Sequence, residues 1–342
     1  MAVFKDDIAL GRNITEALGI LERELGSQYC YCRTLEGCSN EVHIIEDVHS
    51  GSAYIVRFTR QSRFQNYSVE RKILSHVVGR SVATSQAYLF ADGIVTACIE
   101  GHCIESDKML GDSPYYELIA KQMRRLHEIS VHDDGASAMH FESHYGLRSL
   151  LDISVDYMGK GREAEVLYKL YSEDGVLGQL VNNHPSLLWT CISHNDLHSG
   201  NIIYCPSTQE VRFIDWEYST YSINAFDIAC FFLEFTGIDC EISAFPCASK
   251  RQDFYRHYFG NSNLLIDSLC LFFVPLACLF WAAWSSGVDG IDVYTKNRTR
   301  LGHAVLRKLA NEIWPQCGLA PGKEDYELLE LVDFTFQSLY TN

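Results

Sequence analysis

Positive charge is scarce in this sequence. Its 342 residues include 28 lysines and arginines against 44 aspartates and glutamates, which gives a formal net charge of −16. Nucleic acids are bound by basic surfaces, so this balance argues against a nucleic-acid partner and suits a cationic ligand better. The acidic excess lies in residues 103–342, which hold 18 basic and 32 acidic residues, against 10 and 12 in residues 1–102.

Paired cysteines are also missing. The 13 cysteines are an odd number and include no Cys-x-x-Cys pair. Cys30, Cys32, Cys38 and His43 cluster loosely, but their spacing matches no structural zinc pattern, so reduced thiols are favoured over a metal site. The N-terminus lacks the basic and then apolar segments of a signal peptide. Together these features predict a cytoplasmic protein.

Charge is absent from one long segment. The 21 residues between Asp267 and Asp289 carry none, and the run is long enough to span a bilayer. No basic cluster flanks it, and acidic residues stand at both ends, contrary to the usual pattern of a membrane span. A helix buried within a large domain and kinked at Pro275 is therefore favoured, with no stable membrane insertion.

Repeats and low-complexity tracts are absent as well. Hydrophobic residues make up 47% of the chain and charged residues 21%, which is typical of a packed globular protein. The length predicts two lobes, a mainly β lobe over residues 1–102 and a larger, mainly helical lobe over 103–342. In the first lobe the patterns predict a helix over 6–25, strands at 29–35, 41–45 and 53–58, a helix over 68–78, and strands at 86–90 and 94–99.

The second lobe begins after Glu100-Gly101. Ser113 and Pro114 are typical of a helix start, and this helix is expected to reach Glu128. A polar loop is expected over 130–146, short buried strands over 187–192 and 211–214, and mainly helices from residue 225 onward.

Three polar residues near these short strands are spaced for phosphoryl transfer. Asp196 and Asn201 lie five residues apart, and Asp215 follows Asn201 by fourteen. Transfer from ATP needs a carboxylate that accepts the hydroxyl proton and oxygen ligands for Mg²⁺. The spacing resembles the catalytic loop and metal-binding aspartate of the protein-kinase-like fold, an α+β fold of two lobes. His194, Asp196 and His198 also form His-x-Asp-x-His, so a metal-dependent hydrolase is the alternative.

Two segments carry a closer resemblance. HNDLHSGNIIY, which begins at His194, and FIDWEYSTYSINAFDIACFFLEF, which begins at Phe213, resemble the choline/ethanolamine kinase family. The resemblance implies that Asp196 is the catalytic base and that Asn201 and Asp215 bind Mg²⁺. It also implies that His194 and Asp227 support the catalytic loop.

The resemblance extends to ATP binding in the first lobe. Gly37, Ser39 and Asn40 resemble the family's short turn over the phosphates, although a single glycine makes a poor glycine-rich loop. Arg57 matches the cation of the third strand, with Glu70 as its carboxylate partner on the following helix. No Walker A sequence occurs, and Gly159-Lys160-Gly161 does not follow a strand, so P-loop and Rossmann folds are excluded.

The family's substrate is an amino alcohol, whose ammonium is held by carboxylates and aromatic faces. The matching residues are Tyr218, Glu217, Glu234, Trp281 and Trp284. A third aromatic residue usually follows the tryptophans, but the matching position falls near Lys296, with only Tyr294 close by. Asp239 also stands where many choline kinases have an aromatic residue. A weaker aromatic cage favours the primary ammonium of ethanolamine over choline, and dual use fits as well.

The sequence therefore predicts an enzyme that uses ATP and Mg²⁺ to phosphorylate ethanolamine, choline or both, for phospholipid synthesis. Family resemblance suggests a homodimer. Two alternatives stay open: another small-molecule phosphotransferase, such as the aminoglycoside type, and a catalytically inactive scaffold.

Overall fold

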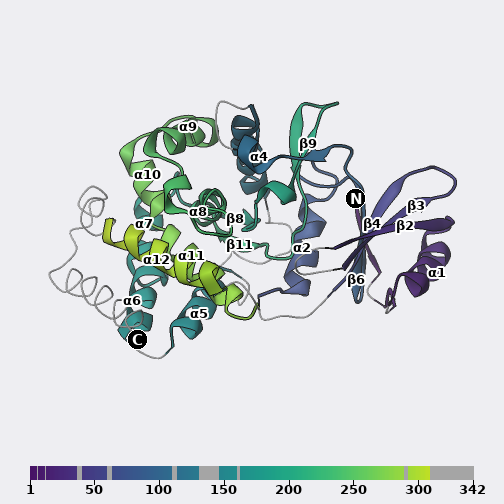
Figure 1. Ribbon diagram of the computed structural model, residues 1–342, viewed down its shortest axis with the longest axis horizontal. Helices are drawn as coiled ribbons and strands as arrows, with labels where there is room; N and C mark the ends of the chain where they lie inside the picture. The colour runs from purple at the N-terminus through teal and green to yellow at the C-terminus, as the bar shows by residue number, and fades with distance from the viewer. Residues whose placement is uncertain are drawn as a thin grey trace. The chain divides into compact units, whose positions relative to one another are not determined.

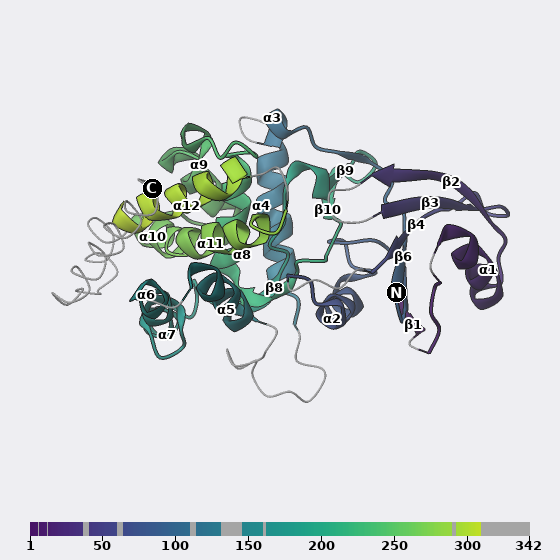
Figure 2. The same cartoon turned by 60° about the horizontal axis from the view of Figure 1, so that its bottom comes forward.

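The structure divides into two compact units, shown as ribbons in Figures 1 and 2. The computed structural model describes residues 1–5, 7–11, 13–36, 41–59, 64–109, 114–130, 146–159, 162–288 and 292–308. The first unit comprises Met1–Glu105 and Ser199–Ser219, and the second comprises Ser106–His198 and Thr220–Asn342. The boundary after residue 102 was predicted for functional lobes and stays a prediction. Residues 199–219 belong to the first unit, so they pack with the N-terminal part of the chain.

The first unit is built on a six-stranded sheet. Its strands run in the order β1-β5-β6-β4-β3-β2, and only β1 and β5 pair in parallel among these six. The bounds are β1 Ala2–Lys5, β2 Tyr29–Glu36, β3 Glu41–Asp47, β4 Ala53–Phe58, β5 Ala87–Phe90 and β6 Gly93–Ala97, with helix α2, Tyr67–Val77, between β4 and β5. The predicted order of three strands, a helix and two strands is therefore confirmed.

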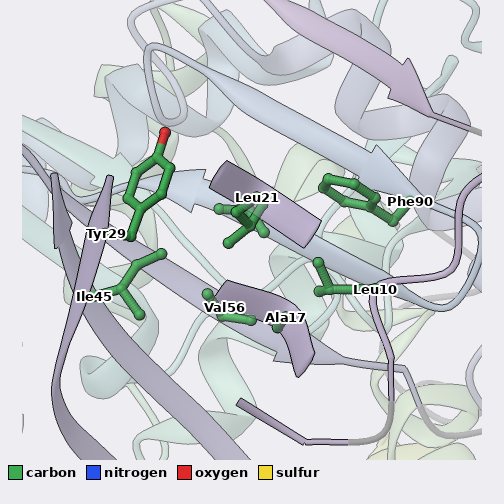
Figure 3. Close-up of a cluster of buried hydrophobic side chains, with 8 residues drawn as sticks. Leu10, Ala17, Leu21, Tyr29, Ile45, Val56 and Phe90 are labelled. Atoms are coloured by element: carbon green, nitrogen blue, oxygen red, sulfur yellow. The ribbon is translucent and has the colours of Figure 1, made fainter. Parts of the chain in front are cut away.

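Helix α1, Ile14–Leu25, lies against this sheet. Figure 3 shows Ala17 and Leu21 of α1 among Tyr29, Ile45 and other apolar side chains of the sheet, all of them buried. The helix predicted over 6–25 starts later than expected. Asn13 caps the helix, since its side-chain oxygen accepts the Glu16 N–H at 3.0 Å.

A smaller sheet completes the first unit. Strands β7 (His102–Cys103), β9 (Ile202–Cys205) and β10 (Glu210–Phe213) run in the order β10-β9-β7, and the single turn η2, Ser199–Asn201, precedes β9. In this antiparallel hairpin Phe213 lies opposite Ile202. The residues just before β9 and just after β10 are therefore brought to the same end of the hairpin.

The second unit is mainly helical. Among its described residues, strands β8 (Thr190–Ser193) and β11 (Thr220–Ile223) pair, with Thr220 opposite Ser193. Its helices are α3 Ser106–Met109, α4 Pro114–His127, α5 Leu147–Met158, α6 Arg162–Tyr171, α7 Val176–Asn183, α8 Asn224–Glu234, α9 Ala248–Phe259, α10 Leu264–Leu271, α11 Val274–Ser285 and α12 Asp292–Lys308, with the short turn η3 at Ile242–Ala244. Helix α8 packs against α10, α11 and both strands, and its residues 224–233 are all buried.

The long uncharged segment forms two helices of this unit. Leu264–Ser285 has a mean hydropathy of 2.2 and is long and apolar enough to cross a membrane, but 89% of its most apolar window is buried. Buried helices of globular proteins also have this composition, and the burial of the segment agrees with the prediction of a buried helix. The single kinked helix was wrong in detail, because α10 ends at Leu271 and Pro275 lies in the first turn of α11.

Candidate active site

Arg57 of β4 lies at the centre of an ionic cluster in the first unit. Its Nη1 lies 3.0 Å from Oε2 of Glu217 and 3.3 Å from Oδ1 of Asp215, and its Nη2 forms an ion pair with Glu70 of α2. The Arg57 side chain is 13% exposed, and those of Glu70 and Glu217 are 6% and 3% exposed. Poor solvation strengthens these interactions well beyond those of a surface pair.

The cluster contains more negative than positive charge. The pKa of Glu70 is raised to about 7, mainly because burial disfavours the ionised carboxylate. The nearby carboxylates of Asp215 and Glu217 also raise it, whereas Arg57 lowers it. Three carboxylates around one guanidinium therefore leave an excess of negative charge. A bound cation would relieve it, as would a shared proton.

Asn201 and Asp215 stand at the same end of the β9–β10 hairpin. The backbone N–H of Ile214 donates to the carbonyl of Asn201 at 3.0 Å, which holds the two segments together. Asp215 adopts a left-handed backbone with φ of 62°, and its side chain is 36% exposed. Amide and carboxylate oxygens are hard ligands of the kind Mg²⁺ prefers. Asn201 and Asp215 lie beside a cluster with excess negative charge, so their oxygens fit a magnesium ion.

Asp227 organises the loop after β8 in the second unit. This fully buried carboxylate of α8 accepts the backbone N–H groups of His194 at 2.8 Å and Asn195 at 2.7 Å. Burial alone would raise the pKa of Asp227, but hydrogen bonds and charge from His127 and His194 hold it below its usual value. The loop is thereby fixed immediately before Asp196, whose side chain is 15% exposed.

His127, which sequence reasoning missed, is the third partner of Asp227. It lies in the last turn of α4, its Nε2 lies 2.9 Å from Oδ2 of Asp227, and its Nδ1 lies 2.5 Å from the hydroxyl of Tyr258. The pairing crosses 100 residues of sequence. No local pattern around His127 distinguishes it from a histidine in an ordinary helix end.

Trp281 and Trp284 lie on one face of α11 in the second unit. Their ring centroids are 5.6 Å apart with planes at 75°. Burial keeps the pKa of the Cys230 thiol on α8 well above its usual value. Helix α11 packs against α8, the helix that ends at Glu234.

Glu234 has a partner that the sequence did not reveal. Arg298 of α12 lies 3.5 Å from Glu234, and its guanidinium lies 4.8 Å from the centre of the Tyr294 ring. Tyr294 is buried, whereas Lys296 is exposed. The structure therefore buries the aromatic side chain of Tyr294, one helical turn before the buried Arg298, and leaves Lys296 at the surface.

Glu217 and Tyr218 lie in the first unit. The hydroxyl of Tyr218 accepts a hydrogen bond from Gln65 at 3.4 Å, and the Glu217 carboxylate pairs with Arg57. This contact makes Glu217 a partner of the arginine. Its predicted part in substrate binding stays a prediction.

Several predicted residues lie outside the described part of the chain. They are Gly37, Ser39, Asn40 and also Cys38, one of the residues considered above for a zinc site. No group of three or more histidine, cysteine, aspartate or glutamate side chains suited to a metal is found among the described residues. His198 Nε2 and Asp196 Oδ2, from the weighed His-x-Asp-x-His set, are 3.9 Å apart.

Solved structures with this architecture include two kinases. The Plasmodium vivax ethanolamine kinase has a TM-score of 0.64 and 20% identity, covering 86% of this chain and 90% of that one. The Cryptosporidium parvum choline kinase also has a TM-score of 0.64, with 17% identity over 90% of this chain and 98% of that one. The predicted α+β, protein-kinase-like fold is confirmed.

Sequence comparison identifies the family. The ethanolamine kinase of Drosophila melanogaster is 27% identical over 244 residues, 66% of this chain and 46% of that protein. Human ethanolamine kinase 1 is 28% identical over 241 residues, 64% of this chain and 52% of that protein. The chain thus spans about half the length of these relatives. The model of the choline/ethanolamine kinase family matches residues 32–296, most of the chain, and this protein therefore belongs to that family.

Proposed function

We propose that this protein transfers the γ-phosphoryl group of ATP to the hydroxyl of ethanolamine or choline. The observation that carries the proposal is the Asp227-held loop, which fixes the backbone directly before Asp196. A kinase needs a carboxylate fixed in this way to orient the acceptor hydroxyl and take its proton. An inactive scaffold has no need of one.

Asn201 and Asp215 are the proposed magnesium ligands. When bound, Mg²⁺ would neutralise charge on the phosphates. Arg57 is proposed to steady the phosphates, while Glu70 and Glu217 keep its guanidinium in place. The segment that contains Gly37, Ser39 and Asn40 is proposed, on the family resemblance, to cover the phosphates.

The ammonium is proposed to bind in the second unit. Glu234 would supply a carboxylate, and Trp281 and Trp284 would supply aromatic faces. Tyr218, which lies in the first unit, stays a proposed substrate-binding residue on the family resemblance alone. A carboxylate favours a primary ammonium with N–H donors, so ethanolamine is the preferred substrate of this proposal.

The test is a measurement of ADP release with ATP and Mg²⁺ in the presence of ethanolamine or choline. Asp215→Ala is expected to abolish turnover while the protein stays folded, as monitored by circular dichroism. Full activity of Asp215→Ala would refute the metal assignment. Turnover with an aminoglycoside but with neither amino alcohol would favour the other phosphotransferase class.

We also propose a cytoplasmic homodimer that serves phospholipid synthesis. The proposal rests on family membership. Light scattering coupled to size-exclusion chromatography tests the oligomeric state, and a monomer at micromolar concentration would contradict it.

A further inference from the structure

The second unit contains a buried arginine to which the proposed mechanism gives no part. The Arg298 side chain is 1% exposed, and a guanidinium keeps its charge inside proteins. Its Nη1 donates to the carbonyl of Leu233 at 3.0 Å and to the hydroxyl of Thr236 at 3.2 Å. Both acceptors lie at the C-terminal end of α8, where carbonyl groups favour a positive charge. Arg298 is thereby fixed to the end of the helix that carries Glu234.

Glu234 is the counter-ion of this buried charge. Nη2 of Arg298 lies 3.5 Å from Oε1 of Glu234, and the Tyr294 ring faces the guanidinium at 4.8 Å. A buried cation is stable only beside an ionised partner or an aromatic face, and here it has both. The arginine in turn restrains the Glu234 carboxylate through one of its oxygens.

The restraint has different consequences for the two amino alcohols. The Glu234 side chain is 18% exposed, and its second oxygen is an acceptor that an ammonium group can use. A primary ammonium donates hydrogen bonds, whose strength depends on the direction of the acceptor. A trimethylammonium has no N–H group and responds to charge and aromatic faces only. The orientation of Glu234 therefore matters more for ethanolamine than for choline.

We propose that Arg298 is a positioning residue that orients the Glu234 carboxylate for a primary ammonium and so sets the preference of the enzyme for ethanolamine over choline. The inference rests on the proposed function, since it takes Glu234 as the ammonium ligand. Arg298 itself need not contact the substrate.

Steady-state kinetics of Arg298→Met test the inference. The KM for ethanolamine is expected to rise about ten- to a hundredfold, the range that one charge-assisted hydrogen bond supplies. The KM for choline is expected to stay within about threefold or to fall, because removal of the cation leaves Glu234 more attractive to any positive charge. The KM for ATP is expected to stay unchanged. Equal increases in KM for both amino alcohols would indicate a structural role and overturn the inference.

Two further variants guard against misfolding and general charge effects. Thr236→Val removes the hydroxyl anchor of Arg298 with little change of shape, and it is expected to raise the KM for ethanolamine about two- to fivefold. Arg300→Met removes an exposed arginine of the same helix and is expected to leave both KM values unchanged. An unchanged ethanolamine preference in Arg298→Met and Thr236→Val would refute the inference.

A stability measurement separates this inference from the proposed function. Glu234→Gln leaves Arg298 buried without its counter-ion, so its Tm should be lower than that of the double variant Arg298→Met/Glu234→Gln. A double variant less stable than Glu234→Gln would refute the pairing, whatever the activity. If wild-type protein phosphorylates neither amino alcohol but the double variant regains stability, the proposed function fails while the pairing stands.

Discussion

Replacement of Asp227 by asparagine removes a charge that holds the catalytic loop. The carboxylate accepts hydrogen bonds from the backbone of His194 and Asn195 and from His127, at 2.7–2.9 Å and without solvent exposure. Each such bond to a charged group contributes about 1.5–3 kcal/mol. Asparagine keeps one acceptor oxygen and turns an NH₂ group toward the remaining donors. A loss of about 3–5 kcal/mol in the free energy of unfolding is therefore expected for Asp227→Asn.

The same substitution is expected to lower kcat about a hundredfold. His194 and Asn195 lie immediately before Asp196, and a displacement of about 1 Å at a catalytic group costs on that order. Urea unfolding measures the stability, and initial rates with saturating ATP and ethanolamine measure kcat at a temperature where the variant is folded.

Asp267→Asn is the matched control. Asp267 is a similarly buried carboxylate of the second unit that accepts two hydrogen bonds from Arg251 at 2.7 Å and one from Tyr255 at 3.0 Å. Its replacement should cost comparable stability and leave kcat of the folded enzyme within about twofold. An equal loss of kcat in both variants, or an unchanged kcat in Asp227→Asn, would show that Asp227 does not position the catalytic loop.

Three further perturbations probe other parts of the molecule. In the absence of Mg²⁺, Glu70→Gln should make stability depend less on pH. Folding raises the pKa of wild-type Glu70 from 4.5 to about 7, so ionising this carboxylate destabilises the fold as pH rises through that window. An unchanged pH dependence of the free energy of unfolding in urea titrations would count against this. Gly101→Ala should lower the Tm by several degrees, because the added Cβ would lie 2.2 Å from the carbonyl oxygen of Tyr204. Gly287→Ala is the control, since a Cβ there would lie 3.7 Å from its nearest neighbour and should leave the Tm unchanged. Equal Tm values for the two variants would contradict the clash. Trp284→Ala should raise the KM for choline about five- to thirtyfold by removing an aromatic face, and an unchanged KM would exclude this residue from ammonium binding.

The strands of the first unit were predictable because each is a short apolar run between turn residues. The predicted ranges 29–35, 41–45 and 53–58 agree with β2, β3 and β4 to within two residues. Strand β1 was missed because its partner, β5, lies more than 80 residues away, and nothing local marks a four-residue strand. The late start of α1 follows from Gly11, whose φ of 99° interrupts the helical pattern before Asn13.

The candidate site was predictable where function requires fixed spacing along the chain. Asp196, Asn201 and Asp215 stand out because a loop and a hairpin set their separation. His127 and Arg298 did not stand out, because both act through partners from 64 to 100 residues away on other helices. Burial and pairing of this kind depend on helix packing, which a single sequence does not display.

Formation of the phosphorylated amino alcohol tests the proposed kinase activity directly. ³¹P NMR of wild-type protein with ATP, Mg²⁺ and ethanolamine or choline should show the phosphomonoester of at least one of them. Asp196→Asn should lower its rate by at least about a hundredfold, whereas Asp174→Asn, which alters an exposed aspartate, should not. Absence of the phosphomonoester with both amino alcohols in folded wild-type protein would contradict the proposed activity, and an equal rate in Asp196→Asn would contradict the role of Asp196 as the base.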